Sequence, residues 1–267
     1  MMLGVYRRVF GIGLQDTFVY RWNFVLRSLF SVVPLIATVF VWRAVCEQGS
    51  GLTEYNLSTM VFYFVTVMIV DNLASPTEDE WRIAAEIREG QISSLLIKPI
   101  NHLAYRLSLF ASYRFLYSLV TFPVVAIIIW ALRGYLHLPH NPFTWLLFAL
   151  SVVGSALLQF FIAYALAMLA FWILEVSTLI FILYSFEYFL SGHVFPLDLL
   201  SPNIRAVIQW APFPYELFFP VQILLDRLDG AALVRGFAMQ FLWVCIMGCV
   251  ARFLWLRGVR KYQAAGL

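Results

Sequence analysis

Three ionisable side chains lie within or beside long apolar stretches of this sequence, where a charge is unusual. They are Arg114, Glu175 and Glu187. A charged group at membrane depth costs free energy, and such groups often mark functional sites. Glu187, which is followed by Tyr188, is the strongest candidate, and an ion pair with an arginine on the outer side is the alternative. Arg114 and Glu175 are expected to extend from the ends of their stretches toward the polar membrane surface.

Motifs for nucleotide binding and hydrolysis are absent from the sequence. Its only two lysines, Lys98 and Lys261, do not follow a glycine, so the phosphate-binding loop G-x-x-x-x-G-K-[ST] cannot occur. The motifs H-E-x-x-H and G-x-S-x-G and Asp-rich metal motifs are missing as well. We therefore expect no cofactor in this chain, and the case for a membrane hydrolase or prenyl transferase is weak.

Possible metal ligands occur only in pairs. His137 and His140 flank a short turn, and Cys245 and Cys249 lie one helical turn apart. A stable zinc site needs three or four ligands, so neither pair predicts a metal centre. The histidines are expected to form a solvated turn, and the cysteines to be small packing residues.

The composition places the chain in a membrane. Apolar residues make up 62% of the 267 residues and charged residues only 12%, against roughly half and a quarter in soluble domains, and the mean hydropathy is +0.83. At about 20 residues per transmembrane helix, the length allows roughly five to seven spans and no separate catalytic domain. The net charge of +3 gives no reason to expect a nucleic-acid partner.

The distribution of apolar residues predicts an all-α integral membrane protein in which residues 1–267 form one domain. Residues 1–22 are expected to form an amphipathic helix on the membrane surface, with apolar side chains spaced by four and Arg8 and Gln15 on another side. Uncharged runs predict six transmembrane helices at residues 24–42, 57–70, 107–132, 143–169, 173–190 and 236–254.

Positive charges predict the orientation of these spans. Of the 18 Lys and Arg residues, 13 fall in the N-terminal segment, the connection between the second and third spans and the C-terminal tail, and 5 fall on the other side. Because Lys and Arg are enriched in cytoplasmic connections, both termini are predicted to be cytoplasmic.

The connection at residues 76–99 has the pattern of a charged helical elbow. Thr77 and Glu80 form a capping box after Pro76, and Gly90 is a stop signal. A short second helix is expected at residues 92–97, before a proline.

The charged helix has two predicted faces. Ile83 and Ile87 form an apolar stripe at the i, i+4 spacing. Arg82 and Glu86 have the same spacing on another face, where an exposed pair contributes only about 0.3–0.5 kcal/mol. The helix is either a docking surface or a solvated face that is anchored by Trp81.

A second unusual segment, residues 191–229, precedes the last span. It contains five prolines together with aromatic residues that include Phe213 and Tyr215, so it is too apolar for a solvated loop and too broken for a span. Irregular backbone at membrane depth requires protein or a water-filled cavity around it. Short re-entrant helices in the outer leaflet are expected, and an external cap packed on its own aromatics is the alternative.

Several short stretches, taken in order, resemble the type 2 ABC exporter permeases, which are bacterial membrane subunits served by a separate ATPase. The stretches are Glu86-Ile-Arg-Glu-Gly90, Leu95-Leu-Ile-Lys-Pro99, Ser191-Gly-His-Val-Phe-Pro196, Ala211-Pro-Phe-Pro-Tyr215 and Gly258-Val-Arg-Lys-Tyr262. Together with the surface helix, the six spans and the broken segment, they extend the resemblance over nearly the whole chain.

The resemblance implies a half-transporter in the bacterial cytoplasmic (inner) membrane. Two such permeases, identical or related, would bind a dimer of cytoplasmic ABC ATPases that hold ATP and Mg, and would export substrate by alternating access. The elbow resembles the family's coupling helix, and residues 1–22 resemble its interface helix. The expected ATPase-coupling residues are Glu80, Trp81, Arg82, Ile83, Glu86, Ile87, Arg88 and Glu89, and the expected residues of the translocation path or gate are Glu187, Tyr188, Phe213 and Tyr215.

Two other classes of protein stay open on the sequence alone. One is an integral membrane enzyme acting on lipids, with the broken segment as the roof of its active site. The other is a non-transporting assembly factor on the same fold, which analogy of fold cannot distinguish from a transporter.

Overall fold

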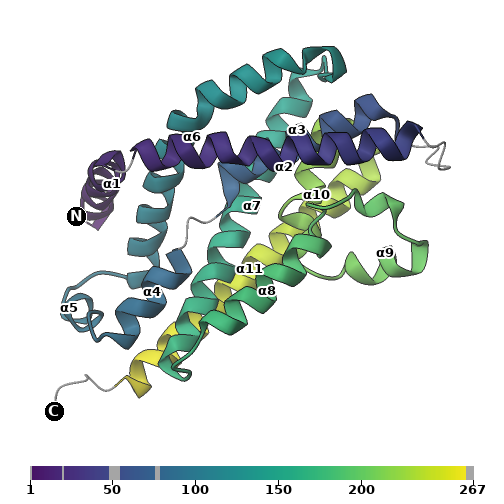
Figure 1. Cartoon of the computed structure of the whole chain (residues 1–267). Helices are drawn as coiled ribbons and strands as arrows, with labels where there is room; N and C mark the ends of the chain where they lie inside the picture. Colours follow the sequence, from purple (N-terminus) through teal and green to yellow (C-terminus); the bar gives the residue numbers. More distant parts are fainter. Residues whose placement is uncertain (1, 20, 48–54, 76–78, 263–267) are drawn as a thin grey trace.

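The computed structural model describes residues 2–19, 21–47, 55–75 and 79–262 (Figure 1). In these ranges every regular element is a helix, as the sequence predicts. Six helices match the apolar runs: α2 (Arg21–Glu47), α3 (Leu57–Ala74), α6 (His102–Ala131), α7 (Pro142–Met168), α8 (Ser177–Leu190) and α11 (Gly230–Lys261).

Among the residues that the structure describes, four helices are long and apolar enough to cross a bilayer, and they begin at Leu57, His102, Pro142 and Gly230. Within the described residues, α2 and α8 contribute shorter apolar helices, Val32–Val45 and Ser177–Leu190. At 1.5 Å per residue, the 14 residues of α8 rise about 21 Å, less than the ~30 Å hydrocarbon core. Six spans therefore stay a prediction.

The predicted start of the fifth span is wrong by four residues. The helix begins at Ser177 and not at residue 173, because the Glu175 side chain accepts a hydrogen bond from the Ser177 backbone N–H at 3.0 Å just before the first turn. Hydrogen bonds from Ser177 lower the pKa of Glu175, which is fully exposed in the connection between α7 and α8. Its charge therefore lies outside the helical spans.

Asn and Asp side chains fix the starts of the long helices. Asn56 accepts from the Thr59 N–H, Asn101 from Ala104 and Asn141 from Phe143, which satisfies one free donor in each first turn. Asp229 does the same for α11 through the Ala232 N–H, at 2.6 Å.

Helix α7 lies at the centre of the packing. It contacts α3, α4 (Asp79–Arg88), α10 (Phe218–Leu224) and α11, and its longest contact runs along α11. The two helices approach closely where Gln240 reaches from α11 to the Ser151 carbonyl oxygen at 2.9 Å. At Gly236 a Cβ atom would lie 2.0 Å from the Phe219 ring, so this position requires glycine for the observed packing.

Helix α1 (Met2–Val19) packs on α6, and its apolar side is therefore covered partly by protein. Phe10 contacts the Phe115 ring at a centroid distance of 6.4 Å. The Tyr6 hydroxyl accepts a hydrogen bond from the Asn101 N–H at 3.2 Å, while Arg8 and Gln15 are exposed. Helix α2 lies across α3 and α6, and α6, which contains Pro123, bends along its length (Figure 1).

The segment before the last span contains short helices, as predicted. They are η3 (Leu197–Leu199), α9 (Pro202–Ile208), η4 (Phe213–Tyr215) and α10 (Phe218–Leu224). Helix α10 is buried against α3 and α7, while most of α9 is exposed. The segment therefore combines an interior part with an outer part.

Candidate functional site

The charged elbow forms the short helix α4 (Asp79–Arg88), followed by a turn and α5 (Ser93–Leu96). The predicted capping box involves Pro76 and Thr77, which lie outside the described residues. Ile83 and Ile87 are 2% and 4% exposed and pack in an interior cluster with residues of α6, α7 and α11. Their i, i+4 spacing therefore defines the inner face of α4.

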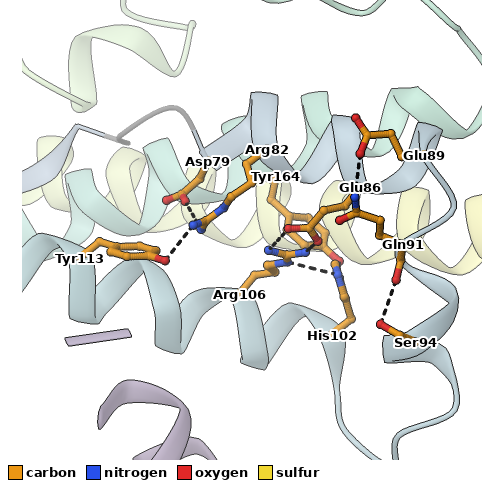
Figure 2. A network of polar contacts seen from close by, with 10 residues as sticks. All are labelled: Asp79, Arg82, Glu86, Glu89, Gln91, Ser94, His102, Arg106, Tyr113 and Tyr164. Carbon is orange, nitrogen blue, oxygen red and sulfur yellow. Dashed lines mark hydrogen bonds and ion pairs between the residues drawn. The ribbon is translucent and has the colours of Figure 1, made fainter. Parts of the chain in front are cut away.

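An ion pair fastens α4 to the transmembrane helices. Glu86 pairs with Arg106 of α6, whose side chain is only 4% exposed (Figure 2). The predicted neighbour pair of Arg82 and Glu86 is wrong, because Glu86 turns toward Arg106 on another helix. Arg82 instead bonds to Asp79 at 2.8 Å and to the Tyr113 hydroxyl at 2.7 Å.

The ion pair continues as a chain of hydrogen bonds into the bundle. Arg106 Nε donates to His102 Nε2 at 3.3 Å, which leaves the proton of the neutral ring on Nδ1. That Nδ1 lies 2.7 Å from the Tyr164 hydroxyl of α7, and the ring stacks on Trp255 of α11 at 4.1 Å. The hydrogen bonds join α4 to α6 and α7 (Figure 2), and the stacking on Trp255 adds α11.

The outer face of α4 is open to solvent. Trp81 is 39% exposed, and the Arg82 side chain is 41% exposed. Arg88 and Glu89 are exposed about two turns later. Arg88 donates to the Leu174 carbonyl oxygen at 3.3 Å, and Glu89 accepts from Gln91 at 2.7 Å. These four side chains, which we call the outer face of α4, form one surface.

The end of α11 holds the turn that follows α4. The Tyr262 hydroxyl donates to the Gly90 carbonyl oxygen at 3.1 Å and lies 2.8 Å from the Ser93 hydroxyl. Gly90 has a φ of 78°, a conformation that favours glycine. The elbow is thus fixed at its end as well as along its inner face.

Glu80 departs from the expected exposed position. It is only 3% exposed and faces α8, where its carboxyl group lies near the Tyr184 hydroxyl. A cavity of about 320 Å³ separates α4 from α8, and Glu80, Trp81 and Glu187 are among its lining residues. Glu80 therefore belongs to the interior of the protein.

A second cavity, of about 400 Å³, adjoins the first. Ser75, Tyr188 and His193 line both cavities, and the second also reaches Asp71 and Arg114. The predicted path residues Glu187 and Tyr188 thus lie beside a polar hollow near the C-terminal end of α3. The charge distribution predicts that this end of α3 faces the cytoplasm.

His193 forms a hydrogen-bonded chain that the sequence analysis missed. Its Nε2 lies 3.0 Å from Asp71 Oδ1, and its Nδ1 lies 2.7 Å from the Ser191 hydroxyl. The three residues have the order of a nucleophile–base–acid triad, but Ser191 is fully buried. A substrate cannot reach its hydroxyl, so the chain is a structural clamp.

Arg114 does not extend toward the membrane surface, contrary to expectation. It is 7% exposed, and its guanidinium donates to the carbonyl oxygens of Asp71 and Asn72 at the end of α3. A cation at this end favours the helix dipole. The Arg114 donors add to the bonds that these oxygens already accept from the Ser75 N–H and the Ser118 hydroxyl.

Two of the predicted gate residues, Phe213 and Tyr215, lie in packed positions. Tyr215 is 8% exposed, its hydroxyl donates to the Gln209 carbonyl oxygen at 2.8 Å, and its own carbonyl oxygen accepts from Gln240 at 2.9 Å. Phe213 is half-buried beside it. This placement favours the alternative in which the segment packs against its own aromatics.

The fold and the anchored, charged elbow define a polytopic helical membrane protein that presents a helix outside its spans. Residues 32–266 match the sequence model of the family described as ABC-2 family transporter protein. The chain belongs to this family and is a membrane permease of an ABC transporter, as the resemblance implies. It matches no curated protein.

Proposed function

We propose that the chain is the permease subunit of an ATP-driven exporter, with ATP and Mg held by separate cytoplasmic ATPase subunits. Two permeases, identical or related, would form the complex and move substrate outward by alternating access. The observation that carries the proposal is α4, which exposes Trp81, Arg82, Arg88 and Glu89 while its other face is fixed to α6 and α7. A force applied to that helix reaches the spans without a flexible link.

The test of this function is co-expression with the ABC ATPase encoded nearest to the permease, followed by affinity purification. We expect the two proteins to purify together in detergent, and ATP hydrolysis to rise when the complex is placed in liposomes. A permease that purifies alone and turns over lipid would instead support the membrane enzyme. A stable complex that moves no solute would support an assembly factor.

Both termini are proposed to face the cytoplasm of a bacterial inner membrane, on the basis of the 13-to-5 charge distribution. In a cysteine-free variant, a cysteine at Arg7 should react in intact cells only with reagents that cross the membrane. A cysteine at His137, which is exposed after α6, should react with impermeant maleimides. Labelling of Arg7→Cys by the impermeant reagent would reverse the topology.

A further inference from the structure

The cavity between α4 and α8 is lined by both acidic and aromatic side chains, a combination that is unusual in a membrane protein. It holds two carboxyl groups, Glu80 and Glu187, and three aromatic rings, Trp81, Tyr184 and Tyr188. Among the described residues that line it there is no lysine or arginine, and His193 is its one basic side chain. His193 is already paired with Asp71 at 3.0 Å.

A third carboxyl group adds to this excess of acid. Glu216 is fully buried, and its carboxyl lies within hydrogen-bonding reach of Glu187. Within the described part of the chain, neither Glu216 oxygen has a hydrogen-bond donor. A buried charge is costly unless a partner compensates it.

The aromatic rings supply the second half of a cation site. The faces of Trp and Tyr attract cations that have shed their water, and aromatic cages recognise quaternary ammonium groups. Tyr188 is held by the His193 ring, at a centroid distance of 4.9 Å and an interplanar angle of 19°. The ring therefore has a fixed orientation at the boundary of the two cavities.

The adjoining cavity offers an acceptor to the rest of such a ligand. Asn72 is 7% exposed and lines that cavity. Its amide nitrogen donates to the Met68 carbonyl oxygen, but its Oδ1 has no hydrogen-bond partner among the described residues. Because this oxygen is itself covered, an N–H or O–H group of a bound molecule would satisfy it only after the Asn72 amide turns toward the cavity. Arg114, the permanent cation of this cavity, is directed to the carbonyl oxygens at the end of α3.

We propose that this cavity binds an organic ammonium cation, with Glu80 and Glu187 as the counter-charges and Trp81, Tyr184 and Tyr188 as the aromatic walls. The inference rests on the proposed transport function, because it names the substrate class for that site. Glu80 and Trp81 belong to α4, and the other three residues belong to α8. Movement of α4 by an ATPase would therefore separate the two halves of the site and release the cation.

The test uses the purified permease alone in detergent, with radiolabelled benzyltrimethylammonium as the probe and equilibrium dialysis as the measurement. We expect saturable binding that neopentylbenzene, the uncharged isostere, and benzenesulfonate do not displace. Glu187→Gln and Tyr188→Leu should each weaken binding at least tenfold. Tyr188→Phe, which keeps the ring, should bind within threefold of the unmodified protein.

Asp226→Asn is the matched control, since Asp226 is an exposed carboxylate that lines neither cavity, and it should bind normally. Because Tyr188 is 51% exposed, Tyr188→Leu should fold, and thermal melting checks this. Displacement by neopentylbenzene, or unchanged binding in both Glu187→Gln and Tyr188→Leu, would overturn the proposal. Loss of ATPase co-purification would reject the transport function without affecting this result.

Discussion

Glu86→Arg is expected to destabilise the permease by about 3–5 kcal/mol, the usual cost of leaving a buried charge without its partner. Arg106 is 4% exposed and pairs with Glu86. The substitution would place two guanidinium groups together at the junction of α4 and α6. His102 and Tyr164, which continue the chain, would lose their alignment. Thermal melting in detergent and the yield of monodisperse protein measure the effect.

The control for this variant is Glu89→Arg. It introduces the same charge change three residues later, at an exposed carboxylate whose hydrogen bond joins it to Gln91, so stability should change by less than about 0.5 kcal/mol. Exchanging the partners, in Glu86→Arg with Arg106→Glu, should recover part of the lost stability. Equal melting of Glu86→Arg and Glu89→Arg would show that the ion pair does not anchor α4.

Arg88→Glu should abolish most ATPase binding while leaving the permease folded. Arginines at the centre of interfaces often contribute 2 kcal/mol or more, which corresponds to about a 30-fold loss of affinity. Arg88 lies on the outer face of α4, and its hydrogen bond to the Leu174 carbonyl oxygen, at 3.3 Å, is long. Co-purification, and titration of the ATPase onto the permease in nanodiscs, give the affinity.

Arg260→Glu serves as the matched control for Arg88→Glu. It makes the same charge change at an exposed position near the end of α11, and it should bind the ATPase normally. Both variants should melt within a few degrees of the unmodified protein. An Arg88→Glu variant that binds and stimulates the ATPase as before would leave α4 as a solvated helix and would remove the main support for the proposed coupling.

The apolar helices and the apolar stripe of the elbow were predictable because their signals are local. A run of apolar residues such as that of α7 specifies a membrane helix by composition alone. Ile83 and Ile87 form the apolar stripe that the i, i+4 spacing predicts. They were expected among the ATPase-coupling residues, but the stripe is buried against the long helices. The short helices of residues 191–229 follow in the same way from prolines that interrupt an apolar stretch.

Partners that come from another helix were not predictable. Arg82 and Glu86 have the spacing of a helix-surface pair, but a buried guanidinium on α6, that of Arg106, competes for Glu86. Asp71 and His193 are 122 residues apart, and nothing near either residue in the sequence indicates the other. Glu80 looks like a surface residue beside Trp81, and only the position of α8 makes it an interior one.

The contact between Tyr262 and the turn at Gly90 sets an order of events during synthesis. Helix α4 emerges from the ribosome early, but the residue that fastens its following turn comes 172 residues later. Until α11 has inserted, the turn after α4 lacks its hydrogen bond from Tyr262, so the elbow that carries the outer face of α4 is not yet fixed at its end. A partner that binds α4 only when the Gly90 turn is fixed by Tyr262 would therefore bind only permeases whose last helix has inserted. Incomplete permeases would then be left out of the complex.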